Sequence, residues 1–124
     1  QALTDEEVDR IKRVHRECQA DPKTHADEEL VEKYYKGEHV DKSVVGAHIL
    51  CMSTKFGNLN AEGKVNKANL KTEFSRFISD DSKLNQAVDK CAVENSDAQD
   101  TALALLKCFR EQISLGAQDD HYYH

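Results

Sequence analysis

The four cysteines are the residues whose type and spacing are most informative about chemistry. Cys18, Cys51, Cys91 and Cys108 lie far apart and form no CxxC pair, so neither a zinc ribbon nor a thioredoxin-type redox site is expected. An even set without such a pair favours two disulfides in an oxidising compartment, and four free structural thiols are the alternative. Four cysteines allow three pairings, and their positions alone leave all three open.

Two other patterns bear on metal binding. The loop from Asn58 resembles an EF-hand calcium loop, with Asn58, Asn60 and Glu62 at its first, third and fifth positions and Gly63 at its sixth. An EF-hand loop starts with Asp and ends with a bidentate Glu at the twelfth position, where this sequence has Asn58 and Asn69. The terminal HYYH offers two histidines without further ligands. We therefore expect no metal and no cofactor, and a calcium-binding, EF-hand-like protein that uses residues 58–69 is the less favoured alternative.

Catalytic motifs are missing from the sequence. There is no GxSxG nucleophile motif, and the cysteine nearest to His48 is Cys51, which we assign to a disulfide. The many carboxylates fall on polar faces of the predicted helices, where solvation is the default. We expect no enzymatic activity.

Composition sets limits on the class of protein. The 124 residues favour one domain, 1–124, and 39% apolar with 32% charged residues is typical of a globular chain. The formal net charge of −6 argues against nucleic acid and anionic membrane surfaces as partners. No apolar run approaches the roughly 20 residues of a membrane span, so stable membrane insertion is not expected. Because the sequence begins at Gln1 without an apolar leader, we expect any signal peptide to have been removed.

The elements that position the cysteines are predicted to be about six short helices. Apolar residues recur at helical spacing from about residue 4 to 18, near 27–36, over 41–57, from about 66, from about 79 to 91, and near 97–115. Residues 117–124 have no cap and no period, and are predicted to be a flexible tail. The predicted helix caps and ends are Thr4 with Glu7, Gly37, Asp41, Gly57, Asn66, and Ser96 with Gln99.

The last two predicted helices do not form a simple hairpin around their cysteines. At 1.5 Å per residue, Cys91 and Cys108 would be out of register by roughly 12 Å. Pairing them requires segment 92–98 to unwind and to run back along the last helix, which its Asn, Ser and Asp content permits.

The cysteine positions resemble those of the insect odorant-binding proteins, in particular their four-cysteine ("C-minus") group. The fuller family pattern has six cysteines, with three residues between the second and third and eight between the fifth and sixth. Cys51 fits the third position, and Ala47 stands where the second would be. Cys108 fits the sixth, and Gln99 in "QDTALALLKCF" stands where the fifth would be.

The resemblance implies a disulfide pairing and a fold. Cys18 and Cys91 fit the first and fourth positions, so the family's pairing implies Cys18–Cys51 and Cys91–Cys108, with one bridge missing between positions 47 and 99. The implied fold is all-α, with about six short helices around an internal apolar cavity. The loss of a bridge leads to the hypothesis that the third and sixth helices move more than in six-cysteine relatives, which would broaden the ligand range.

The resemblance also implies a function. It implies a secreted, extracellular carrier, in sensillar lymph or haemolymph, that binds and solubilises small hydrophobic ligands such as odorants or pheromones. A non-sensory lipid or hormone carrier of the haemolymph type is the alternative. We expect a monomer or weak dimer, and the sequence identifies no receptor contact. Some relatives fold their tail into the pocket in a pH-dependent way, but this tail is short and polar.

The expected ligand-binding residues are apolar positions from several helices and a few polar ones. Helical spacing does not distinguish a cavity wall from a filled core, so core packing is the alternative for each of them. The family pattern implies Ile49, Met52, Leu84, Val88, Leu105 and Phe109. The apolar stripes add Ile11, Val14, Phe56, Leu59, Leu70, Phe74 and Ile113, and the candidates for orienting a ligand oxygen are Tyr34, His48 and Ser53.

Overall fold

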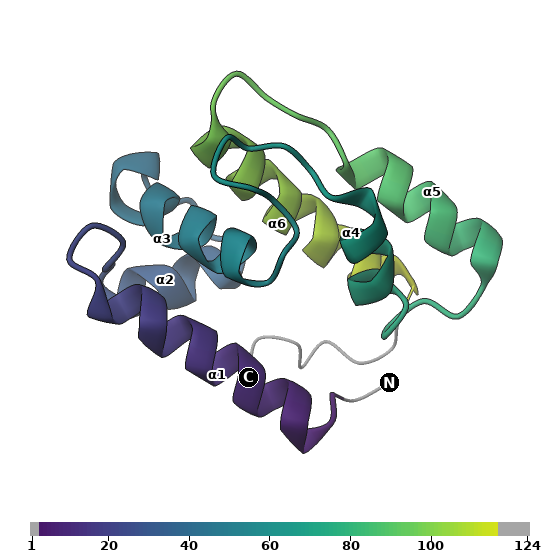
Figure 1. Ribbon diagram of the computed structural model, residues 1–124, viewed down its shortest axis with the longest axis horizontal. Coiled ribbons are helices and arrows are strands. Elements are labelled where there is room, and N and C mark those ends of the chain that lie inside the picture. Colours follow the sequence, from purple (N-terminus) through teal and green to yellow (C-terminus); the bar gives the residue numbers. More distant parts are fainter. Residues whose placement is uncertain (1–2, 117–124) are drawn as a thin grey trace.

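The computed structural model describes residues 3–116, which form six helices and, beyond them, one isolated antiparallel bridge. In Figure 1, α6 crosses the middle of the molecule between α3 and the α4–α5 pair, and α1 runs along the lower edge. Helix α3 packs against α1, α2 and α6, and α5 packs against α4 and α6. The prediction of an all-α fold with six short helices is confirmed. The helices are α1 (Asp5–Ala20), α2 (Glu28–Tyr35), α3 (Lys42–Lys55), α4 (Lys67–Phe74), α5 (Asp81–Cys91) and α6 (Ala98–Gly116).

Most of the predicted helix caps form as expected. The Thr4 hydroxyl accepts the Glu7 backbone N–H at 3.1 Å, and the Glu7 carboxylate accepts the Thr4 N–H at 2.8 Å, which completes the capping box of α1. Asp41 and Asn66 cap α3 and α4 through their side chains. Gly57 follows the end of α3 with φ of +86°, a left-handed conformation that favours glycine.

The predicted capping box of Ser96 with Gln99 is wrong. Helix α6 begins at Ala98, and the Asp97 carboxylate accepts the backbone N–H of Asp100 at 2.8 Å. Aspartate caps as well as serine does, and Asp97 is one residue closer to the helix. The same carboxylate lies 2.8 Å from the Lys42 ammonium, so this cap also connects the starts of α3 and α6.

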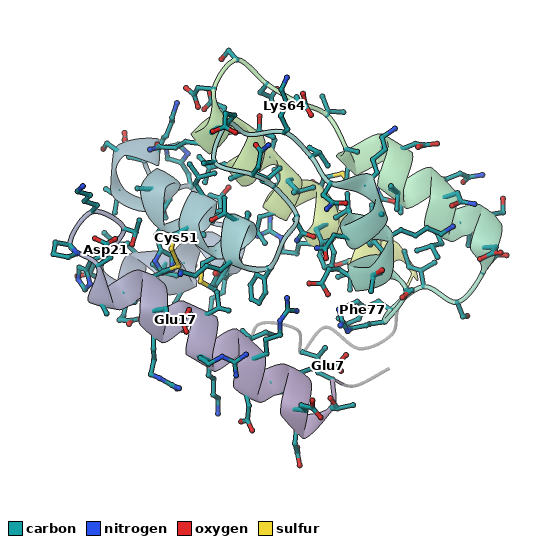
Figure 2. All side chains as sticks on the ribbon, viewed as in Figure 1. Glu7, Glu17, Asp21, Cys51, Lys64 and Phe77 are labelled. Atoms are coloured by element: carbon teal, nitrogen blue, oxygen red, sulfur yellow. A yellow bond between two sulfur atoms is a disulfide. The ribbon has the colours of Figure 1, made fainter. Side chains whose placement is uncertain are left out.

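The disulfides pair as the resemblance implied. Cys18–Cys51 joins α1 to α3 with a Cα–Cα distance of 5.9 Å, and its yellow sulfur bond is visible between these helices in Figure 2. Cys91–Cys108 joins α5 to α6 at 5.5 Å. Helix α5 ends at Cys91, and the non-helical residues 92–97 allow the return, as predicted.

A filled aromatic and aliphatic core lies between α4, α5 and α6. The rings of Phe74 and Phe109 stack with their centroids 4.4 Å apart, and Phe77 meets Phe109 edge-on at 6.2 Å. Leu84 and Val88 of α5 are each 5% exposed and belong to the same cluster. This part of the interior is therefore packed rather than hollow. Within residues 3–116, no helix combines the length and apolar character needed to cross a membrane.

Candidate ligand-binding site

A cavity of about 970 Å³ lies on the other side of α6, between α1, α2, α3 and α6. Its volume is at the upper end of the range typical of small-molecule pockets. It is not sealed, because exposed charged residues of α1 and α2 form part of its wall. The lining residues are Leu3, Val8, Ile11, Lys12, His15, Arg16, Glu28, Val31, Glu32, Tyr35, Lys36, Ile49, Met52, Ser53, Phe56, Asn58, Leu105, Leu106, Phe109, Arg110 and Ser114.

Helix α3 supplies the most apolar part of the wall. Ile49, Met52, Ser53 and Phe56 follow one another at spacings of three and four residues, which places them on one face of a helix. Ile49 is 1% exposed and Met52 is 5% exposed. Because the methionine side chain is flexible and polarisable, it can adapt to ligands of different shape.

Both ends of α1 are fixed where the helix covers the cavity. The Cys18–Cys51 disulfide holds its C-terminal half on α3. Towards the N-terminus, Arg10 contacts Glu73 of α4 at 3.3 Å, and Arg76 forms ion pairs with both Glu73 and Glu7. Figure 2 shows Glu7 on the part of α1 that lies nearest to Phe77, beyond the end of α4. The position of α1 over the cavity thus depends on one covalent and one electrostatic attachment.

Three polar side chains lie at or behind the inner wall. His15 Nε2 lies 2.8 Å from a carboxylate oxygen of Glu28, which joins α1 to α2. Burial alone would raise the pKa of Glu28, but hydrogen bonds with Gln19 and His15 outweigh it and lower this pKa. Ser53 is 8% exposed, lines the cavity, and has a hydroxyl without a hydrogen-bond partner among residues 3–116.

His48 lies behind this wall rather than on it. It is 1% exposed, and its ring meets that of His15 edge-on with centroids 5.2 Å apart. Its Nδ1 lies 3.2 Å from the Thr24 carbonyl oxygen, whereas its Nε2 is buried with no hydrogen-bond partner among the described residues. Burial is the largest cause of the lowered pKa of His48, and the neighbouring His15 lowers it further.

The two tyrosines of α2 have different roles. Tyr34 donates its hydroxyl hydrogen to the Leu103 carbonyl at 3.1 Å, which attaches α2 to α6, and burial raises its pKa. Tyr35 lines the cavity, and burial together with the nearby Glu28 raises its pKa. Arg110 of α6 donates to the Tyr34 and Tyr35 carbonyls at 3.2 and 3.1 Å, so it caps the C-terminal end of α2.

The structure divides the residues expected from the sequence into two groups. The first group lies on the cavity wall: Ile11, Ile49, Met52, Ser53, Phe56, Leu105 and Phe109. The second group is not part of that wall and packs in the core or between helices: Val14, Tyr34, His48, Leu59, Leu70, Phe74, Leu84, Val88 and Ile113. The apolar stripes of α4 and α5 thus lie in the filled core, whereas that of α3 and the Leu105 and Phe109 side chains of α6 face the cavity.

Helix α2 and several charged residues line the cavity although the sequence did not predict them there. Val31, Glu32 and Lys36 of α2 line the cavity, as do Lys12 and Arg16 of α1. Charged positions on a short helix are typical of a solvated face, so charge alone gave no sign of the cavity. Only the rotation of α2 about its own axis, relative to α6, would have indicated that Tyr35 and not Tyr34 faces the cavity.

The loop that resembles an EF-hand has another structure. The Asn58 side-chain oxygen accepts a hydrogen bond from Asn69 at 2.7 Å, and that of Asn60 accepts the backbone N–H groups of Glu62 and Lys64 at 3.0 and 2.9 Å. Protein donors therefore occupy the Asn58 and Asn60 oxygens that a calcium ion would need. Within residues 3–116, no three His, Cys, Asp or Glu side chains come together in a way that could hold a metal.

The position of the missing bridge is filled by packing. The side-chain amide of Gln99 lies directly over Gly46, next to Ala47, where a Cβ on the glycine would collide with it. Lys42 adds contacts to Asp97 at 2.8 Å and to Asp100 at 3.0 Å across the same pair of helices. The expected extra mobility of α3 against α6 stays a prediction. The expected tail, 117–124, lies outside the described residues.

The chain thus combines an all-α fold, two disulfides and a cavity lined by four helices. The chain belongs to the PBP/GOBP family, whose model matches residues 1–112, and it has the four-cysteine pattern within the odorant-binding proteins. It is similar to the B2 and B1 proteins of Tenebrio molitor, with 27% and 24% identity over 108 residues; each match covers 87% of this chain, and 83% and 82% of those proteins.

Solved structures share the fold. Odorant-binding protein dmelOBP28a from Drosophila melanogaster matches with a TM-score of 0.68 and 20% identity, over 89% of this chain and 94% of that one. A protein described as the fatty acid binding protein OBP56a, from the oral disk of the blowfly Phormia regina, matches with a TM-score of 0.72 and 24% identity, over 93% and 98% of the two chains.

Proposed function

We propose that this protein carries small hydrophobic molecules, such as odorants, pheromones or lipids, in the cavity between α1, α2, α3 and α6. The observation that supports this most is the cavity itself, of about 970 Å³, with a floor made by Ile49, Met52 and Phe56. Removing apolar ligand surface from water contributes roughly 25 cal/mol per Å², which is enough to bind molecules with few polar groups. The fatty acid binding described for OBP56a, which has the same fold, is consistent with such ligands.

The residues proposed to contact the ligand are those expected from the sequence that also line the cavity. Ser53 would orient a ligand oxygen, because its hydroxyl has no partner among the described residues. We further propose that the protein works outside the cell and carries out no chemistry. Both disulfides favour an oxidising compartment. Sensory and haemolymph carriers would use the same cavity.

The test is displacement of a neutral naphthylamine fluorophore by a panel of volatile alcohols, esters and long-chain alcohols. Ile49→Val removes one methylene from the cavity wall, so affinity should fall about four-fold, given ~0.8 kcal/mol per buried methylene. Ile113→Val removes the same group from a residue of α6 that is 3% exposed and does not line the cavity. This matched variant should leave affinity unchanged.

Two results would contradict the proposal. The first is that the fluorophore fails to bind, or that no member of the panel displaces it. The second is that Ile113→Val weakens binding as much as Ile49→Val does, since the ligand would then lie elsewhere or respond only to stability.

A further inference from the structure

The charge on the cavity wall differs from that of the whole chain. The sequence has a formal net charge of −6. Among the cavity-lining residues, Lys12, Arg16, Lys36 and Arg110 are cations, and only Glu28 and Glu32 are carboxylates. An acidic protein thus has a cavity wall with more positive than negative groups.

Both carboxylates already have a partner nearby. Glu28 lies 2.8 Å from His15 Nε2, and Glu32 lies 2.9 Å from the Lys36 ammonium one turn further along α2. A ligand cation would have to compete with these contacts. The acidic residues therefore do not favour a cationic ligand.

Arg110 also has hydrogen-bond partners already. Its guanidinium donates to the last carbonyls of α2, where the partial negative charge of the helix C-terminus offsets its positive charge. The cations that remain are Lys12 and Arg16 of α1, whose side chains have no ion pair or hydrogen bond with any other residue between 3 and 116.

Lys12 and Arg16 are placed to act together. They are four residues apart, which puts neighbouring side chains on one helix face with Cβ atoms about 5–6 Å apart. Val8, Ile11 and His15 share that face and line the same cavity, so the two charges adjoin apolar surface. An arginine beside a lysine suits a carboxylate, since the guanidinium can donate two parallel hydrogen bonds to it.

We propose that the preferred ligand class of this cavity is amphiphiles with an apolar chain and one carboxylate, and that Lys12 and Arg16 hold the carboxylate at the α1 side while the chain extends towards Ile49 and Phe109. This inference rests on the proposed carrier function. Lys12 and Arg16 provide an anchor that the apolar wall lacks, so the affinity for a ligand depends on its charge.

The test compares three ligands of equal chain length: dodecanoate, methyl dodecanoate and dodecan-1-ol, each displacing the neutral fluorophore below its own aggregation limit. The double variant Lys12→Gln with Arg16→Gln should weaken the binding of dodecanoate by roughly 2- to 30-fold, because it removes two exposed ion pairs that contribute about 0.2–1 kcal/mol each. Binding of the ester and the alcohol should stay the same. Raising the salt from about 50 to 500 mM should weaken only dodecanoate.

Arg13→Gln is the matched control, since this exposed arginine of α1 does not line the cavity. It removes one charge without touching the proposed anchor, so dodecanoate affinity should not change. The anchor is refuted, and the carrier function stands, if all three ligands bind but the double variant leaves the affinity for dodecanoate unchanged. The same conclusion follows if Arg13→Gln weakens dodecanoate binding as much as the double variant does. If neither the fluorophore nor any of the three ligands binds, the carrier function fails and the anchor with it.

Discussion

Acid should destabilise the folded protein through His48. This imidazole is 1% exposed, and its Nε2 has no hydrogen-bond partner among residues 3–116, so no acceptor would receive a proton added to that atom. Burial is the main cause that lowers its pKa from the usual 6.5, and His15 and His25 lower it further. The Thr24 carbonyl and Glu28 act in the opposite direction, but less strongly.

The direction of this pH dependence follows from the difference in proton binding at His48 between the unfolded and the folded protein. The unfolded chain binds a proton at His48 near pH 6.5, whereas the folded protein binds it only at a lower pH. The contribution to stability is therefore intact above about pH 6.5 and is lost as the pH falls towards the folded-state pKa. At pH 5 the loss is at most about 2 kcal/mol, since the pH is 1.5 units below 6.5 and each unit corresponds to about 1.36 kcal/mol.

The assay is urea unfolding at pH 7.5 and pH 5.0. His48→Gln should reduce the difference in unfolding free energy between the two pH values by up to that amount. His39→Gln, at an exposed position, should leave the difference as in the wild type. A histidine-resolved NMR titration should also show one ring that protonates below pH 6.5. The reasoning is refuted if His48→Gln keeps the full wild-type pH dependence, or if the His48 ring titrates at or above 6.5.

Three further predictions concern other parts of the structure. Glu73→Gln removes the negative charge that Arg10 and Arg76 share, and should cost about 1–3 kcal/mol in urea unfolding. The exposed Glu29→Gln should cost little, and equal effects of the two substitutions would contradict this role. Ser53→Ala should weaken the binding of alcohols by about 2- to 12-fold in fluorophore displacement, because a hydrogen bond of ~0.5–1.5 kcal/mol is lost. Binding of a hydrocarbon of equal length should stay the same. Equal weakening of both ligands would exclude the hydroxyl as an anchor. Ala47→Cys with Gln99→Cys should form a disulfide, detected by mass. The bridge should narrow the range of ligands that bind and slow the hydrogen exchange of α3. A closed bridge that changes neither would refute the hypothesis of helix mobility.

Local signals in the sequence were enough to place most of the fold. The Thr4–Glu7 capping box, the Asp41 and Asn66 caps and Gly57 each act within one turn of the chain, so their residue types determine the outcome. Ser96 was misjudged because Asp97, its neighbour, caps equally well and also binds Lys42 of a distant helix. That contact between α3 and α6 was not visible in local sequence.

The cavity was predicted less well than the fold. Leu84 and Val88 have the same four-residue spacing as Met52 and Phe56, yet the first pair packs in the filled core and the second lines the cavity. Periodicity shows which face of a helix is buried, but not whether a neighbouring helix fills the space beside it. That depends on how α1 is held away from α6, which the Cys18–Cys51 disulfide and the arginine contacts with Glu73 determine together.

A small hydrophobic ligand is proposed to bind between α1, α2, α3 and α6 rather than in the core beside α5. A titration of methyl-labelled protein with dodecan-1-ol, followed by NMR, tests this proposal most directly. The methyl groups of Ile11, Ile49 and Leu105 should show saturating shifts, whereas those of Leu84 and Val88 should change little. Shifts centred on Leu84 and Val88, or no saturable shift anywhere, would contradict it.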